Sequence, residues 1–86
     1  MDLLLLRIRR RLEMILPNKE ELKRLRDMYH KGTRVVLLEM DDPQAPPIGT
    51  KGTVRYVDDA AGICVNWDNG SSLSAIYGVD RIKKLE

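Results

Sequence analysis

Few side chains in this sequence of 86 residues have the types and spacing that a reaction needs. Its one histidine, His30, follows a predicted helix, where an imidazole usually caps the C-terminal end and interacts with the helix dipole. Ser71 and Ser72 have no histidine or lysine close by in the sequence that would activate a hydroxyl as a nucleophile. We therefore expect no catalytic residue and no enzymatic activity.

Two pairs of carboxylates, Asp41-Asp42 and Asp58-Asp59, raise the question of a metal site. A calcium-binding loop alternates its oxygen ligands along the chain, and adjacent residues rarely chelate one ion together. A zinc site needs several cysteines and histidines, whereas this sequence has one of each. No glycine-rich loop opens a helix to hold a nucleotide phosphate. The sequence predicts no metal and no cofactor, and aspartates that form turns.

The single cysteine, Cys64, bears on the cellular compartment, because one cysteine cannot form an intramolecular disulfide. The apolar run over 3–6 is far shorter than the roughly 20 residues that a membrane-spanning helix needs. Arginines follow this run, whereas the charges of a signal peptide precede its apolar core. We expect a cytoplasmic protein without a membrane span.

Two helices are expected at the N-terminus. Apolar residues at three- and four-residue spacing predict an amphipathic helix over 3–16, which Pro17 ends. Asn18 and Glu21 form a capping-box pattern for a second helix over 19–30, which Gly32 ends. Together they make a helical basic arm over 1–31, with nine Lys and Arg against five acidic residues, a net charge of +4. Met14 is an alternative natural start, which would make residues 1–13 an upstream extension.

From Thr33 onward the apolar period changes to two, which predicts β-strands. Strands are expected over 33–40, 53–57, 63–67, about 71–75, and 81–85. Asp68-Asn69-Gly70 predicts a tight hairpin turn, and residues 77–79 predict a single 3₁₀ turn. Five short strands with short connections favour a closed barrel over a sandwich. The predicted fold class is α+β dominated by β: two N-terminal helices followed by a small five-stranded SH3-like β-barrel over 32–86, all in one folding unit.

Several segments resemble a small family of domains of unknown function, encoded mainly on phages, plasmids and conjugative elements of Gram-positive bacteria. The resemblance covers roughly residues 18–86, and its segments are Lys31-Gly32-Thr33-Arg34-Val35, Met40-Asp41-Asp42-Pro43, Ile48-Gly49-Thr50-Lys51-Gly52-Thr53-Val54, Val57-Asp58-Asp59, Val65-Asn66-Trp67-Asp68-Asn69-Gly70-Ser71-Ser72-Leu73 and Gly78-Val79-Asp80. More distantly, residues 67–71 resemble the hairpin of mind-bomb-type SH3-like domains. The first resemblance implies a mobile genetic element as the setting, and the second implies binding of a protein segment.

A barrel of this size encloses only its own side chains, so we expect binding on its surface. The preferred hypothesis is a non-enzymatic module that engages a protein partner through the barrel surface and the helical arm, since Trp and Tyr carry much of the energy in such contacts. The candidate residues are Tyr56, Trp67, Asp68, Asn69 and Tyr77. For Trp67 the alternative is the principal ring of the core, facing inward with Ile63 and Val65.

A second hypothesis is an accessory protein that binds nucleic acid through the basic arm. The candidate residues are Arg7, Arg9, Arg10, Arg11, Lys19, Lys23, Arg24 and Arg26, with Arg34 and Arg55 as helpers on the barrel. Against it, residues 32–86 contain six basic and eight acidic residues, a net charge of −2. No aromatic residue is interleaved with the arginines as a stacking platform for bases.

Two further expectations concern context and assembly. The mobile-element setting allows a small inhibitor of a host defence enzyme, of the kind that blocks CRISPR systems. The apolar strip of the first helix is one that a small barrel covers only in part, which allows a homo-oligomer or packing back onto the same chain. Its members are Leu4, Leu5, Ile8, Leu12, Ile15 and Leu16.

Overall fold

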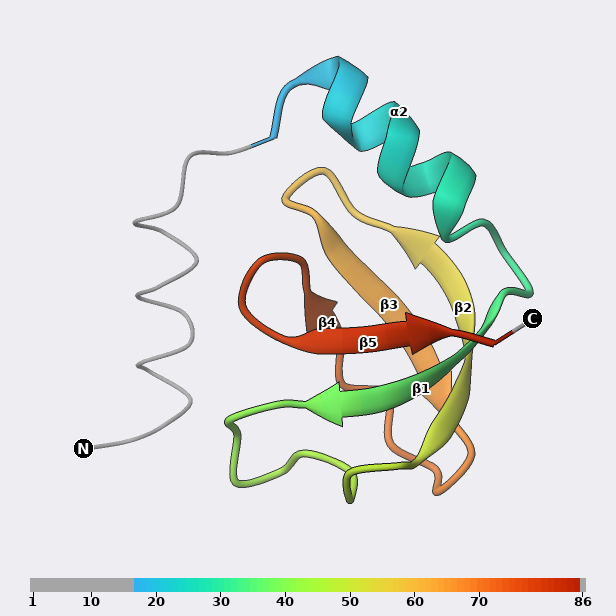
Figure 1. The fold of residues 1–86 in the computed structure, drawn as a ribbon, viewed down its shortest axis with the longest axis vertical. Helices are drawn as coiled ribbons and strands as arrows, with labels where there is room; N and C mark the ends of the chain where they lie inside the picture. The colour runs from blue at the N-terminus through green and yellow to red at the C-terminus, as the bar shows by residue number, and fades with distance from the viewer. Residues whose placement is uncertain (1–16, 86) are drawn as a thin grey trace.

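The computed structural model describes residues 17–85, which form one helix and five strands (Figure 1). The helix, α2, spans Lys19–Met28, so it ends slightly before the predicted end. Asn18 caps its first turn as predicted, because its side-chain oxygen accepts a hydrogen bond of 2.8 Å from the backbone N–H of Glu21. The other predicted helix, over 3–16, lies outside the described residues.

The five strands form one antiparallel sheet in the order β4-β3-β2-β1-β5. Their bounds are β1 Arg34–Glu39, β2 Lys51–Val57, β3 Gly62–Trp67, β4 Ala75–Ile76 and β5 Arg81–Lys84. Four of them lie where the alternation of apolar residues predicts strands. The strand predicted over 71–75 is wrong except at its last residue. The N–H groups of Ser71 and Leu73 bond to side-chain oxygens of Asn69 and Ser71, as in a turn, and not to a neighbouring strand.

The sheet curls without closing, so the prediction of a closed barrel is wrong (Figure 1). Its two outermost strands, β4 and β5, contact each other but form no ladder. The N–H of Ile76 in β4 donates instead to the Asp80 carboxylate at 2.8 Å, and the Asp80 N–H donates to the Ile76 carbonyl at 2.8 Å. These bonds occupy the edge of β4 that a closing ladder would need. The fold is therefore a five-stranded antiparallel sheet with one helix.

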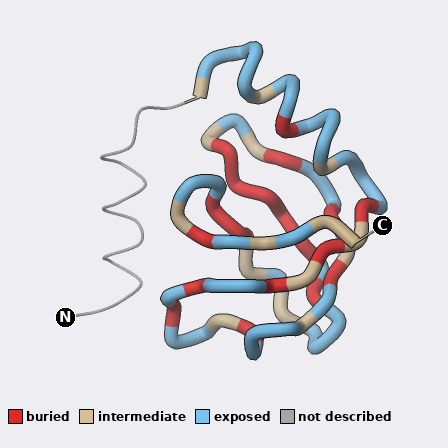
Figure 2. The backbone as a smooth tube through the Cα atoms, viewed as in Figure 1, coloured by how far each residue is buried: buried red, intermediate tan, exposed pale blue. Residues whose placement is uncertain are grey.

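The core lies on the concave side of the sheet, and α2 adds one side chain to it. Leu25 is the buried residue of α2, while most of the helix is exposed (Figure 2). β3 is the most buried strand, with five of its six residues buried, as expected for a strand near the middle of the sheet. The buried cluster consists of Leu25, Val35, Leu37, Met40, Val54, Val57, Ala61, Ile63, Val65, Trp67 and Ala75.

Gly52 allows β2 and β3 to approach closely over the core. A Cβ atom at this position would lie 2.5 Å from Cγ1 of Val65 and 2.8 Å from Cε3 of Trp67. Real Cβ atoms do not tolerate such distances, so glycine is required for the Trp67 indole to pack against β2.

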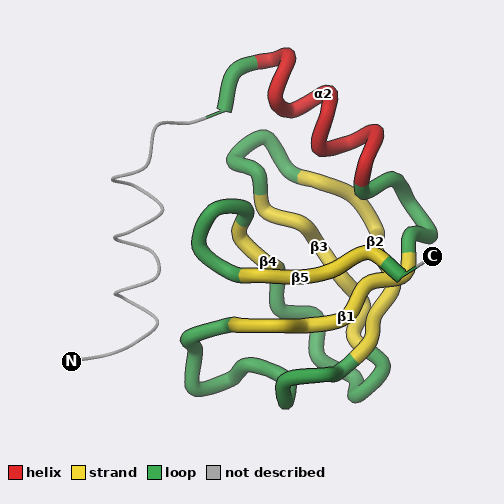
Figure 3. The backbone as a smooth tube through the Cα atoms, in the orientation of Figure 1, coloured by secondary structure: helices red, strands yellow, loops and turns green. Residues whose placement is uncertain are grey.

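Aspartates form turns in two of the loops, as predicted from the sequence. The loops are green in Figure 3. In the loop between β1 and β2, the Asp42 carboxylate accepts a hydrogen bond of 2.8 Å from the Gln44 N–H. In the turn between β2 and β3, the Asp58 carboxylate accepts hydrogen bonds from the N–H groups of Ala60 and Gly62, at 2.9 and 2.7 Å. Both arrangements let a side chain replace the backbone acceptor that a turn lacks.

Candidate functional site

Trp67 belongs to the core and not to the surface. Its side chain lies with the buried residues Ile63 and Val65, and Trp67 is only 3% exposed. The indole N–H donates a hydrogen bond of 2.8 Å to the Leu73 carbonyl, which satisfies the one polar atom of the ring. This is the core position that the sequence offers as the alternative to a binding role, and it leaves no part of the ring for a partner to contact.

Tyr56 is exposed because β2 contains a bulge. The register with β3 shifts between Val54 and Tyr56, so Val54 and Val57 both face the core while Tyr56 faces outward with 55% exposure. The ring lies near the Arg55 guanidinium, 5.7 Å from its central carbon. The buried Cys64 thiol, which lies opposite Tyr56 in the ladder of β2 and β3, raises the pKa of Tyr56. Tyr56 therefore covers Cys64 on the outer, convex face of the sheet.

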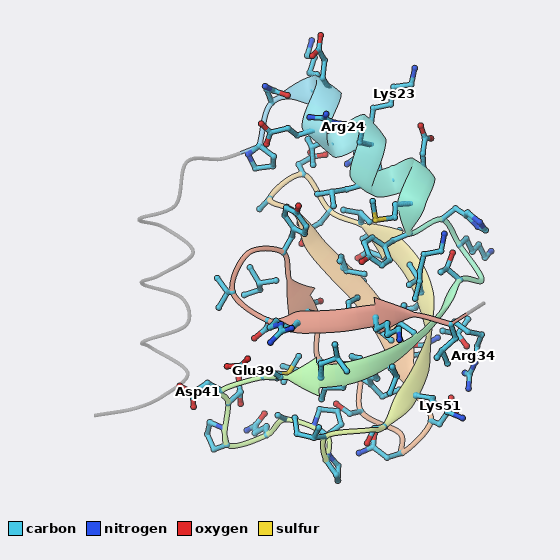
Figure 4. The ribbon with its side chains drawn as sticks, in the orientation of Figure 1. Lys23, Arg24, Arg34, Glu39, Asp41 and Lys51 are labelled. Atoms are coloured by element: carbon cyan, nitrogen blue, oxygen red, sulfur yellow. The ribbon has the colours of Figure 1, made fainter. Side chains whose placement is uncertain are left out.

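Asp68 and Asn69 hold the hairpin that follows β3. Asp68 accepts two hydrogen bonds from the Arg34 guanidinium, at 2.8 and 2.7 Å. These bonds, and the nearby charges of Arg34 and Lys51, lower the pKa of Asp68. Figure 4 labels both cations. Asn69 accepts a hydrogen bond of 3.1 Å from the Ser71 N–H. Both side chains therefore have structural partners, and they lie on the outer face, apart from Tyr77.

Tyr77 lies where α2 meets the turn between β4 and β5, and it is 54% exposed. Its backbone N–H donates to the Ala61 carbonyl at 3.0 Å, which fixes the residue at the end of β4. Tyr29, just after α2, is half-buried beside it; burial and the proximity of Tyr77 raise the pKa of Tyr29. Of the five residues predicted to bind protein, Tyr77 borders two hollows that are lined by residues within 17–85.

Two hollows adjoin at Tyr77. The larger has a volume of about 480 Å³ and lies over the place where β4 and β5 fail to pair. Apolar side chains dominate its lining, with Tyr29, Leu38, Val79 and Ile82 around Tyr77. The smaller, of about 360 Å³, lies on the α2 side and is lined by Glu21, Arg24, Leu25, Met28 and Tyr77. We call the two hollows together the Tyr77 groove.

Sequence patterns missed most of the Tyr77 groove. Tyr29 and Met28 were not among the predicted site residues, and Met28 is 48% exposed at the end of α2. Leu38 is also exposed, at 40%, and it follows the buried Leu37 where the register between β1 and β5 shifts. The sequence offered one indication of the groove. Residues 76–82 contain four apolar or aromatic residues, more than a two-residue strand and a tight turn can bury.

The basic residues predicted to bind nucleic acid divide into two groups. Arg7, Arg9, Arg10 and Arg11 lie outside the described residues. Lys19, Lys23, Arg24 and Arg26 all lie on the exposed faces of α2, where Lys23 extends away from the sheet (Figure 4). Arg26 already has partners, since it donates to the Asp59 carboxylate at 2.7 Å and to the Val57 carbonyl at 3.2 Å.

No cluster of titratable side chains was found that suggests chemistry within residues 17–85. In this range no three His, Cys, Asp or Glu residues lie close enough together to hold a metal ion. His30 is exposed, and its Nδ1 lies 3.1 Å from the Lys31 carbonyl oxygen. The same part of the chain contains no helix that is long and apolar enough to cross a membrane.

Comparison with known proteins gives one match. Residues 18–85 match the family described as Domain of unknown function (DUF4314), which covers the helix and all five strands. No curated protein and no solved structure matches the sequence at a significant level. The resemblance to a family of unknown function over this part of the chain is therefore confirmed.

Proposed function

We propose that the chain, which belongs to the DUF4314 family, is a non-enzymatic module that binds a segment of a protein partner in the Tyr77 groove. One observation carries the proposal: two apolar hollows meet at a half-exposed tyrosine where the sheet fails to close. Small folds normally fill such an opening with their own side chains, and an apolar opening that stays exposed marks an interaction site.

The residues of the groove suit a peptide partner. Tyr29 and Tyr77 offer aromatic faces with polar hydroxyl ends, a combination enriched at the energetic centres of protein interfaces. Leu38, Val79 and Ile82 supply aliphatic surface around them. Full burial of one such side chain stabilises a complex by about 1.5–3 kcal/mol. Two or three side chains of a short segment, seated in the groove, would contribute about 3–9 kcal/mol before the cost of association is subtracted, so we expect a weak complex unless further contacts are made.

The chain offers a matched pair of tyrosines for the test. Tyr77 and Tyr56 are equally exposed, at 54% and 55%, but they lie in the groove and on the outer face respectively. Peptides are selected from a displayed library of random sequences against the whole chain, and the affinity of each is measured by calorimetry. We expect Tyr77→Ser to weaken binding at least tenfold, while Tyr56→Ser binds as the unmodified chain does.

Two results would overturn the proposal. The first is a selection that yields no peptide with saturable binding. The second is a set of peptides whose affinity falls with Tyr56→Ser and is unchanged by Tyr77→Ser, because binding would then use the outer face. Circular dichroism of both variants establishes that the fold is retained, as expected for substitutions of half-exposed side chains.

Nucleic-acid binding through the basic arm is the second candidate. It is favoured by Lys19, Lys23 and Arg24, which are exposed on α2 and make no ion pair within residues 17–85. Replacement of Lys23 and Arg24 by Glu should then abolish binding to a duplex, and the affinity of the unmodified chain should fall steeply with salt. Binding that is unchanged by the replacement would exclude α2 from this role.

Three finer expectations come from the sequence. Carriage on phages or plasmids would make the partner a host protein or another protein of the element, and inhibition of a host defence enzyme is one form of such binding. An SH3-like relationship is compatible with the strand order, since an SH3-like sheet also places its first strand between its second and fifth. Self-association through the apolar residues of segment 3–16 remains a prediction, which light scattering of the chain with and without residues 1–13 tests.

A further inference from the structure

The two edges of the sheet differ in how their backbone groups are satisfied. At the β4 edge, Asp80 bonds to both outward backbone groups of Ile76. Among residues 17–85, no comparable cap lies along β5. Leu85 donates its N–H to the Arg34 carbonyl at 2.8 Å, so the backbone groups of Leu85 point toward β1. Because these directions alternate along a strand, Lys83 also faces β1, while Ile82 and Lys84 face the free edge.

The free edge of β5 borders the Tyr77 groove. Within residues 17–85, no protein group forms a hydrogen bond with the backbone N–H or C=O of Ile82 or Lys84. The Ile82 side chain points inward against the core and lines the larger hollow. A strand added beside β5 would therefore place alternate side chains in that hollow, next to Val79 and Tyr77.

We propose that β5 accepts an extended strand of the partner, in which acidic residues alternate with apolar ones. The proposal rests on the proposed function and specifies its ligand. The backbone of the incoming strand bonds to Ile82 and Lys84 and supplies the affinity, as in other cases of strand addition to a sheet edge. Its apolar side chains enter the Tyr77 groove, and its acidic side chains lie on the outer face beside Arg81 and Lys83.

The charges of β5 select this partner over a second copy of the chain. Three of its four residues are cationic, namely Arg81, Lys83 and Lys84. Pairing of two β5 strands would oppose like charges, which is destabilising. Glu39 does little to neutralise them, because its contact with Arg81 is 3.8 Å long and both side chains are mostly exposed. Pairing of β5 with β4 of another copy is blocked by Asp80.

The test uses synthetic peptides and the whole chain. The probe is a peptide of four Glu-Val repeats, its counterpart of four Lys-Val repeats is the charge control, and affinities are measured by fluorescence anisotropy. We expect the Glu-Val peptide to bind at least tenfold more tightly. N-methylation of single peptide amides should weaken binding at every second position only, because alternate amides of an added strand face β5. Hydrogen exchange at the Ile82 and Lys84 amides should slow when the peptide binds.

Two proline variants test the same bonds from the side of the chain. Lys84→Pro removes an N–H that faces the free edge, so the fold is retained and peptide affinity falls at least tenfold. Lys83→Pro removes a ladder donor to β1 and should lower the melting temperature instead.

If the Glu-Val peptide fails to bind, or if N-methylation weakens its binding without alternating from one position to the next, strand addition is overturned. If the peptide still binds after these changes but loses affinity with Tyr77→Ser, binding in the Tyr77 groove is supported and strand addition to β5 is not. If Tyr77→Ser leaves the affinity unchanged, the proposed function itself is overturned.

Discussion

Asp80 and Ile76 are joined by two hydrogen bonds of 2.8 Å across the turn between β4 and β5, one through the Asp80 carboxylate and one through its backbone N–H. Asp80 is 9% exposed, so its carboxylate acts in a largely dry setting. This pairing ends β4 after two residues and keeps β5 from closing the sheet. The opening that results is the larger hollow of the Tyr77 groove.

Replacement of Asp80 by Ala should destabilise the fold by about 1–3 kcal/mol, because the Ile76 N–H is left buried without its acceptor. Urea denaturation followed by circular dichroism measures the change. Asp59→Ala is the matched control, since the Asp59 side chain is 96% exposed, and its replacement should cost no more than about 0.5 kcal/mol. Equal effects of the two replacements would contradict the assigned role of Asp80.

Trp67→Ala should lower the free energy of unfolding by about 3–5 kcal/mol, as large-to-small substitutions of core aromatics do. Trp67→Phe keeps most of the apolar contact but loses the hydrogen bond to Leu73, so a smaller loss of about 1–3 kcal/mol is expected. Both are measured by urea denaturation. If the Trp67→Ala variant folds with unchanged stability, Trp67 is not a core residue and is again a candidate for binding at the surface.

The ion pair between Arg34 and Asp68 predicts a pH dependence of stability. Since Arg34 lowers the pKa of Asp68 below 3.8, the pair stabilises the fold at neutral pH, and this stabilisation is lost as pH falls through the lowered value. The melting temperature of the unmodified chain should exceed that of Asp68→Asn at pH 7, and the difference should vanish in strong acid. In an Arg34→Met background the Asp68→Asn substitution should have little effect at any pH. A difference that persists in strong acid would refute the role of the pair.

Local patterns predicted the elements that depend on local chemistry. The Asn18 cap, the helix that follows it and four strands came from capping and alternation, since these signals lie within a few residues of one another. The bulge in β2 escaped prediction, because it depends on the register with β3 and not on the alternation within β2 itself. Strict alternation would place Tyr56 on the same face as Val54, whereas the shift of one residue leaves it exposed on the outer face.

The candidate site was harder to predict, because it arises from a failure of two strands to pair. Alternation correctly placed Trp67 on the face of Ile63 and Val65, but it could not say whether that face was closed over. The opening depends on the Asp80 side chain, which reads as an ordinary turn aspartate in the sequence. Tyr77 was named as a candidate from its type alone, while Tyr29 and Leu38 were not named as candidates.

We propose that partners bind where β4 and β5 separate, beside Tyr77. Nuclear magnetic resonance of the ¹⁵N-labelled chain tests it directly, by titration with the tightest peptide from the displayed library. The largest amide shifts should fall at Tyr29 and over residues 77–82, with those of the outer face unmoved. Shifts that gather instead around Tyr56 and Asn66 would contradict the account.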